Sequence, residues 1–187
     1  MAYLYHLCAP DFRGNILYPL NGLWNHFPDL YEREKEKYVG RESVLEYRIP
    51  ILDAVWGDTV NLSTLDPRLL VMARRQLGIP FSQLLMRRLV CIPVERIATL
   101  PAVRYDSASH WRNSSPGDSS VPATPPDHEF AAFDPAQYQE TYEVPSLHRE
   151  YLQRQLAAGE RALGFVFVPH VLVAAPIDLN GLDIIDL

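Results

Sequence analysis

The chain has 187 residues, 48% of them hydrophobic, which is enough for one domain with a core of its own. Its 17 Lys and Arg residues against 23 Asp and Glu residues give a formal net charge of −6, so the overall charge does not favour nucleic acid as a partner. No apolar run reaches the ~20 residues that cross a membrane, and no secretory signal opens the sequence, so we expect a cytoplasmic protein that does not bind membranes.

Strands and helices follow one another in the first part of the chain. Residues 3–8 (YLYHLC) are apolar and aromatic without a helix breaker, which predicts a strand. A proline and a glycine interrupt the apolar residues 16–23, and we expect irregular chain there. A proline at the start and a glycine at the end predict a surface helix over 28–40. The alternation in 59–63 predicts a strand, and the Asp-Pro pair that follows predicts a helix over 66–78.

The middle of the chain carries fewer clear signals. Residues 41–56 fit a helix or a strand, although a proline excludes a helix through the whole stretch. A short helix is predicted over 80–88, followed by a core strand over 89–97 that a proline interrupts. Residues 107–127 are rich in Ser, Pro, Asp and Gly, and we expect a long flexible loop or a functional lid that carries His110-Trp111-Arg112.

The last part of the chain predicts one helix and three strands. Apolar side chains at helical spacing predict a helix over 145–159. Strands are predicted over 164–168 and 171–175, and an edge strand over 182–186 follows an Asn-Gly turn. Because helices and strands are mixed without regular strand-helix-strand alternation, we expect a single α+β domain with a curved mixed, mainly antiparallel sheet and flanking helices.

The cysteines and histidines are scattered along the chain. Cys8 and Cys91 each lie in an apolar stretch, as reduced structural cysteines do, and a disulfide between them would require neighbouring strands. A nucleophilic Cys8 with His6 two residues away is an alternative, but a core position for Cys8 is favoured. Metal sites gather their ligands at short spacings, so we expect no metal site.

His6 is the residue that draws attention. The chain lacks the glycine-rich loops of nucleotide-binding folds, the HExxH motif and the GxSxG motif. Alternation places Leu4, His6 and Cys8 on one side of the first strand. A neutral imidazole there either is a core residue with a satisfied hydrogen bond or presents its second ring nitrogen to a ligand.

The stretch Leu4-Tyr5-His6, followed by Asn15-Ile16-Leu17 and Gly22-Leu23, resembles the opening of the ADP-ribosyltransferase fold. The stretch 58–64 and the helix after it are similar to the strand, Ser/Thr and helix element of that fold. The resemblance implies NAD as co-substrate, an enzyme that transfers a glycosyl group, and His6 as the contact to the NAD ribose.

Further site residues follow from the same resemblance. Ser63 or Thr64 would begin the second element at the cofactor, and the catalytic acid would come from a later strand. Glu95, on the strand predicted over 89–97, and Asp178 are the two later acids that we nominate. Leu7 and Cys8 stand where many members of the family have Gly and Ser or Thr.

The blocks YHLC, LYPLN, GRE and VWGD also resemble a family of uncharacterised bacterial proteins. This resemblance adds Arg41, Glu42, Trp56 and Asp58 to His6 as candidates. Arg41 can bind an anion with two hydrogen bonds, and Trp56 can stack on a base or another ring of the cofactor. The alternatives are a salt bridge for Arg41 and a core indole for Trp56.

Three functions therefore remain open. The first is an NAD-dependent enzyme of ADP-ribosyltransferase type in the bacterial cytoplasm, which acts on a small molecule or a protein. The second is a non-catalytic protein that binds a ligand or partner under the 107–127 loop. The third is an enzyme of another class whose site the sequence does not reveal.

Overall fold

The computed structural model describes residues 1–40, 42–79, 87–107, 125–160 and 162–187. Within these residues, four α-helices flank a mainly antiparallel sheet, so the predicted α+β class is confirmed. Most of the helix predicted over 80–88 and most of the loop predicted over 107–127, including His110-Trp111-Arg112, lie outside the described residues.

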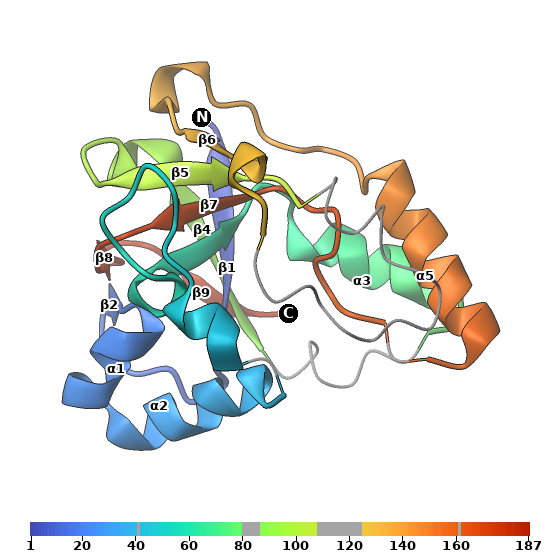
Figure 1. The fold of residues 1–187 in the computed structure, drawn as a ribbon, viewed down its shortest axis with the longest axis horizontal. Helices are drawn as coiled ribbons and strands as arrows, with labels where there is room; N and C mark the ends of the chain where they lie inside the picture. Colours follow the sequence, from blue (N-terminus) through green and yellow to red (C-terminus); the bar gives the residue numbers. More distant parts are fainter. Residues whose placement is uncertain (41, 80–86, 108–124, 161) are drawn as a thin grey trace.

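The main sheet has seven strands in the order β6-β5-β7-β3-β1-β4-β9 (Figure 1). Its strands are β1 (Tyr3–Cys8), β3 (Val60–Ser63), β4 (Arg88–Pro93), β5 (Ala102–Tyr105), β6 (Phe130–Ala132), β7 (His170–Val173) and β9 (Ile184–Asp186). A separate two-stranded sheet pairs β2 (Ile16–Leu17) with β8 (Ile177–Asp178). All these strand pairs are antiparallel, which agrees with the expected sheet type.

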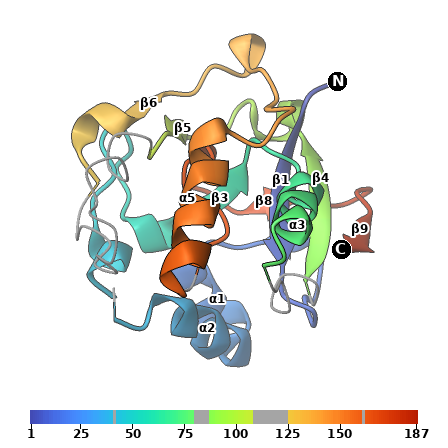
Figure 2. The same ribbon diagram turned by 90° about the vertical axis from the view of Figure 1, so that its right-hand side faces the viewer.

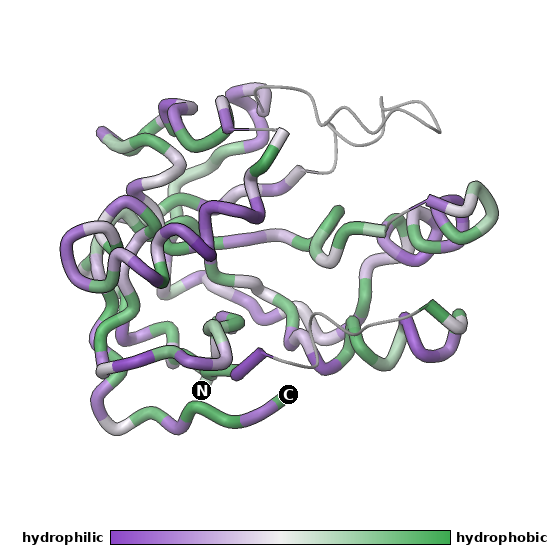
Figure 3. The backbone as a smooth tube through the Cα atoms, turned by 90° about the horizontal axis from the view of Figure 1, so that it is seen from below, coloured by the Kyte–Doolittle hydropathy of each residue, from purple (hydrophilic) through white to green (hydrophobic). Residues whose placement is uncertain are grey.

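Two pairs of helices lie at different sides of the sheet (Figures 1 and 2). They are α1 (Leu20–His26), α2 (Pro28–Lys35), α3 (Pro67–Gln76) and α5 (Ser146–Ala158). The pair α1 and α2 lies at the lower left of Figure 1, and α3 and α5 lie at its right. Hydrophobic and hydrophilic residues alternate along α3 and α5, at the right of Figure 3, as expected of helices with one face on the core.

The main sheet is divided into two halves that meet at one point. β1 pairs with β4 along its whole length, from Tyr3 opposite Pro93 to Cys8 opposite Arg88. Its pairing with β3 is limited to Tyr5 opposite Ser63. In Figure 1, β1 and β4 run steeply down the view, whereas β5 and β7 run nearly across it. We call the place where β1 and β3 part the seam.

Core side chains cover both faces of the sheet. One cluster joins Leu4 and Cys8 of β1 to Val90 and Ile92 of β4 and to the small β2–β8 sheet. A second cluster covers the other face of the half formed by β3, β5, β6 and β7. It consists of Ile49, Leu52, Val103, Tyr105, Phe130 and Leu172, with Trp56 packed against it.

Several predicted elements are confirmed with small shifts. The strands over 3–8 and 59–63 are β1 and β3, and the helices over 66–78 and 145–159 are α3 and α5. The helix predicted over 28–40 is α2 followed by the 3₁₀ helix Glu36–Tyr38. Residues 171–175 and 182–186 correspond to the shorter strands β7 and β9, and β9 is an edge strand as expected.

Other predictions were wrong. Residues 164–168 form turns in place of a strand, because Phe167 has a left-handed φ of 62° and Val168 N donates back to Phe165 O. Residues 16–23 are not irregular, since they contain β2 and the start of α1. The strand predicted over 89–97 ends at Pro93, and a 3₁₀ helix, Val94–Ile97, follows it.

Candidate functional site

His6 lies at the seam between the two half-sheets. Its Nδ1 is 2.9 Å from the backbone carbonyl oxygen of Asn61 on β3. Because a carbonyl oxygen only accepts hydrogen bonds, Nδ1 carries the proton and donates it, and Nε2 is the acceptor nitrogen. Among the described residues, His6 Nε2 has no hydrogen-bond partner, and the side chain is half-buried.

Electrostatics keep the His6 ring neutral at physiological pH. Burial, together with the positive charges of Lys37 and Arg87, lowers the pKa of His6 to about 4. The hydrogen bond to Asn61 O opposes this shift because it favours the protonated ring. His6 therefore presents a lone pair, and not a positive charge, to any group at Nε2.

His170 is a second half-buried histidine near the seam. It lies opposite Ser63 on β3 and opposite Tyr105 on β5, and its Nδ1 is 2.8 Å from the carbonyl oxygen of Val168. Burial lowers the pKa of His170 to about 4, although the charge of Asp106 opposes the shift. The signal that singled out His6, a histidine in an apolar strand, is also present at His170, but His170 was not among the residues predicted from the sequence.

Ser63 and Thr64 are used by the fold. Ser63 is buried, and its hydroxyl donates to Leu65 O at 2.7 Å and accepts from Leu65 N at 3.1 Å. Thr64 Oγ1 lies 2.9 Å from Thr141 Oγ1 and donates to Pro169 O at 3.0 Å. These bonds hold the turn after β3 to neighbouring segments. Both hydroxyls are therefore already hydrogen-bonded within the fold.

Trp56 occupies the core position that was the alternative to cofactor stacking. Its ring meets the ring of Tyr105 edge to face, with centroids 5.3 Å apart. Within the part of the chain that the structure describes, Trp56 Nε1 is nevertheless buried without a hydrogen-bond partner, and so is the side-chain oxygen of Asn61. Asn61 was not predicted as a site residue, because a polar residue in an alternating strand is usually exposed.

Among the described candidates from the blocks GRE and VWGD, Asp58 contacts the LYPLN block, and Glu42 forms no hydrogen bond with the others. Arg41 lies outside the described residues. Glu42 is exposed, and its carboxylate accepts from Gly40 N at 3.0 Å. Asp58 Oδ1 accepts from Asn21 Nδ2 at 2.8 Å, so the LYPLN and VWGD blocks are in contact.

The nominated acids do not reach His6. Glu95 is exposed on the 3₁₀ helix Val94–Ile97, just past the Tyr3 end of β1, and not on a strand. Asp178 is exposed on β8, where it accepts from Asn180 N and lies 3.9 Å from Arg96. Both acids were nominated by their order along the chain, and the sheet topology places them elsewhere.

Cys8 is a core residue. It is 2% exposed, it packs in the cluster with Leu4, and burial raises the pKa of its thiol to about 12. A thiol with this pKa stays protonated at neutral pH, which agrees with the core position expected for Cys8. Cys91 lies opposite Tyr5 and therefore points to the other face of the sheet, and both cysteines are free.

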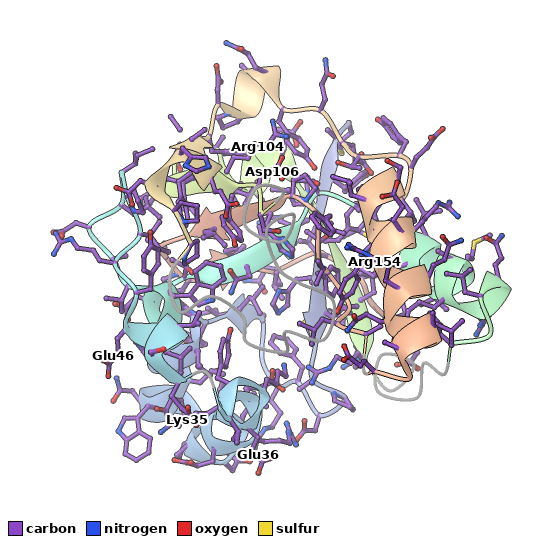
Figure 4. All side chains as sticks on the ribbon, turned by 45° about the vertical axis from the view of Figure 1, so that its right-hand side comes forward. Lys35, Glu36, Glu46, Arg104, Asp106 and Arg154 are labelled. Atoms are coloured by element: carbon purple, nitrogen blue, oxygen red, sulfur yellow. The ribbon has the colours of Figure 1, made fainter. Side chains whose placement is uncertain are left out.

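Charged side chains of both signs surround this face of the molecule. In Figure 4, Lys35 lies at the end of α2, Glu36 at the start of the next 3₁₀ helix, Glu46 on another 3₁₀ helix, Arg104 and Asp106 at the end of β5, and Arg154 on α5. A separate hollow of about 510 Å³ lies along α5 and Phe167. None of the residues that line this hollow belongs to the seam.

The chain matches no protein-family model, no curated protein and no solved structure. In the described part of the chain, no helix combines the length and the hydrophobicity needed to cross a membrane. The geometry of the seam is therefore the basis for assigning a function.

Proposed function

We propose that the chain is an NAD-dependent enzyme of ADP-ribosyltransferase type, with His6 as its contact to the ribose of NAD. One observation carries the proposal: His6 lies where the two half-sheets part, with Nδ1 held by Asn61 O and Nε2 without a partner among the described residues. This arrangement fixes the ring and leaves one acceptor for a ligand.

The chemistry of His6 agrees with a ribose contact. With its pKa lowered to about 4, the ring is neutral at pH 7, and Nε2 accepts a hydrogen bond from a hydroxyl group. A neutral acceptor suits a ribose hydroxyl better than a phosphate, which would require a donor or a positive charge. In the proposed reaction, the bond between nicotinamide and ribose breaks, and an acceptor nucleophile loses a proton as it bonds to the ribose.

The acid of the site is reassigned in this proposal. Glu95 and Asp178 lie away from the seam, whereas Asp106 acts electrostatically on His170, and Asp106 N donates to Glu129 O at 2.9 Å. Asp106 and the buried Glu129 are therefore the acids on the half-sheet that adjoins the seam. We propose that one of these two carboxylates stabilises the oxocarbenium-like ribose in place of Glu95 and Asp178.

The test measures nicotinamide release and binding on the full chain. We expect the unmodified protein to release nicotinamide from millimolar NAD and to unfold at a higher temperature in its presence, because a ligand at one hundred times its Kd adds about 2.7 kcal/mol to the stability. His6→Ala should lose the release. His26→Ala, which removes an exposed histidine of α1, is the matched control and should retain it.

Two results would decide against the proposal. If millimolar NAD neither shifts the melting temperature nor yields nicotinamide, the chain is not an enzyme of this type. If NAD binds and His6→Ala abolishes binding, but no nicotinamide is released, the chain is the non-catalytic binding protein of the second hypothesis.

A further inference from the structure

The tetrapeptide Leu-Asn-Gly-Leu occurs twice in the chain, at residues 20–23 and at residues 179–182. In an Asn-Gly pair, the backbone nitrogen of the glycine can attack the side-chain amide of the asparagine, because glycine has no side chain that hinders the approach. By sequence the two pairs are equivalent. The structure places them in different surroundings, so it predicts which of them reacts in the folded protein.

Asn180 and Gly181 lie in an exposed turn between β8 and β9. Leu182 N donates to Leu179 O at 3.0 Å across this turn, and Gly181 has a left-handed φ of 76°. Among the described residues, neither Gly181 N nor Asn180 Nδ2 has a hydrogen-bond partner. No hydrogen bond therefore restrains the nitrogen that attacks or the amide nitrogen that would leave.

Asn15 holds the carbonyl oxygen of the Asn180 side chain. Its Nδ2 donates to Asn180 Oδ1 at 2.5 Å, and its backbone oxygen accepts from Leu179 N at 2.7 Å. Attack on the side-chain carbon of Asn180 turns Oδ1 into an oxyanion, and an N–H donor that is already in place stabilises an oxyanion. Asn15 therefore favours the attack on Asn180.

Arg96 acts on the attacking nitrogen. Its guanidinium donates to the backbone oxygen of Asn180 at 3.1 Å, and this oxygen belongs to the same peptide group as Gly181 N. A positive charge near a group favours the deprotonated form of that group, so Arg96 makes Gly181 N easier to deprotonate. Asp178 lies 3.9 Å from the same guanidinium and keeps it at the turn.

The pair Asn21-Gly22 is restrained. It lies in α1, whose regular backbone fixes the position of Gly22 N relative to the Asn21 side chain. Asn21 Nδ2, the group that would leave, donates to Asp58 Oδ1 at 2.8 Å. Attack at Asn21 therefore requires α1 to open locally and this hydrogen bond to break, and the free energy of the opening slows the reaction.

We propose that Asn180-Gly181 is a site of spontaneous modification in the folded protein, at which Asn180 becomes isoaspartate or aspartate through a succinimide. Gly181 N bonds to the side-chain carbonyl carbon of Asn180, the bond from that carbon to Nδ2 breaks, and the proton from Gly181 N ends on the departing nitrogen, which leaves as ammonia. Water then opens the succinimide. Its addition at the backbone carbonyl gives isoaspartate, and its addition at the side-chain carbonyl gives aspartate.

The first experiment incubates the full chain at pH 8, either folded or unfolded in urea, and follows both asparagines by mass spectrometry after digestion with trypsin. The tryptic peptide 162–187 contains one asparagine, Asn180, and no glutamine, so a gain in its mass from NH to O reports this site. Enzymatic methylation specific for isoaspartate distinguishes the two products. In urea we expect the two pairs to react at similar rates. In the folded chain we expect Asn21 to react at least about 10-fold more slowly than Asn180.

The second experiment tests the two neighbours of the turn. Asn15→Ala removes the donor to Asn180 Oδ1, and Arg96→Leu removes the positive charge beside the attacking nitrogen. Each variant should slow the conversion of Asn180 in the folded chain by about 5-fold, as for one lost hydrogen bond. The rate at Asn21, measured in the same samples, is the internal control and should not change.

Three results would overturn the proposal or a part of it. If peptide 162–187 gains mass in urea but not in the folded chain, the fold protects Asn180 and the proposal is wrong. If Asn21 reacts as fast as Asn180 in the folded chain, the surroundings of the two pairs do not determine their rates, and the proposal is also wrong. An unchanged rate at Asn180 in Asn15→Ala or in Arg96→Leu would overturn the assistance by that residue. These measurements use neither NAD nor His6, so their outcome does not depend on the proposed function.

Discussion

The side-chain amide of Asn21 occupies the space in which a side chain at Gly57 would begin. A Cβ atom built on Gly57 would lie 2.8 Å from Asn21 Nδ2 and 2.9 Å from Asn21 Oδ1. The same amide donates to Asp58 Oδ1 at 2.8 Å. Helix α1 is thereby held against the 3₁₀ helix Trp56–Asp58, which precedes β3.

We predict that Gly57→Ala destabilises the protein by about 1 kcal/mol or less, because the added methyl group overlaps the exposed Asn21 amide, which must move out of its hydrogen bond with Asp58. Urea unfolding measures the change. Gly22→Ala is the matched control, since its Cβ would have its nearest neighbour at 3.6 Å, an ordinary contact, within α1. Gly22→Ala should leave the free energy of unfolding unchanged or raise it slightly.

A double-mutant cycle tests whether the overlap with Asn21 causes the destabilisation by Gly57→Ala. In the Asn21→Ala background the clash is absent, so Gly57→Ala should cost clearly less than it does in the unmodified chain. Equal costs in the two backgrounds would show that Gly57 is required for a reason other than its contact with Asn21.

The two thiols are predicted to be unreactive in the folded protein. Cys8 is 2% exposed with a pKa raised to about 12, and burial also raises the pKa of Cys91. A thiol-specific chromogenic reagent at pH 8 should therefore detect almost no reaction within minutes, and 2 thiols once the chain is unfolded in urea. Rapid reaction in the native protein that Cys8→Ala removes would contradict the core position of Cys8.

The elements that could be predicted from the sequence are those with local start and stop signals. Helix α3 begins as expected because Asp66 accepts from Arg68 N and Pro67 occupies the first turn. The strand expected at 164–168 fails for a reason that is not local: Val166 O accepts from the ring of His148 on α5, and Phe167 turns the chain. Apolar composition alone cannot report a contact with a helix elsewhere in the chain.

In the candidate site, too, some features could be predicted from the sequence and others could not. His6 could be singled out because a histidine inside an apolar strand is unusual. Its partner is a backbone carbonyl, at Asn61, which any residue supplies, so only the register of β1 and β3 identifies it. Glu95 was nominated as an acid on the strand predicted over 89–97, and that strand ends at Pro93, before Glu95.

We predict that Tyr5→Phe destabilises the fold by about 1–2 kcal/mol. The carboxylate of Glu140 accepts from the Tyr5 hydroxyl and from Tyr3 N, and so ties the segment before α5 to β1. Burial and the Glu140 carboxylate raise the pKa of Tyr5, so its hydroxyl stays protonated and donates. Tyr142→Phe, at a tyrosine that is 74% exposed, is the control and should leave the urea midpoint unchanged. A Tyr5→Phe midpoint equal to that of the control would mean that the bond contributes nothing.

Stability should fall as the pH falls from about 6.5 to about 4, and His148 should cause much of the loss. His148 is fully buried, its Nδ1 lies 2.6 Å from Val166 O, and burial lowers its pKa from 6.5 to about 4. In that pH range the unfolded chain binds a proton that the folded chain does not, so protonation favours unfolding. The shift corresponds to a loss on the order of 3 kcal/mol, and the lowered pKa values of His6 and His170 act in the same direction.

His148→Asn separates this contribution from the others. Its side-chain amide can donate to Val166 O in place of Nδ1 but does not titrate. The variant should be less stable than the unmodified protein at pH 7.5, because a smaller side chain leaves a cavity, and its stability should change less between pH 7.5 and pH 4.5. Urea unfolding at four pH values measures both. The positive charge of Arg74 also lowers the pKa of His148. If the variant's stability depends on pH as steeply as that of the unmodified protein, His148 takes up its proton equally well in the folded and the unfolded chain, and the prediction is wrong.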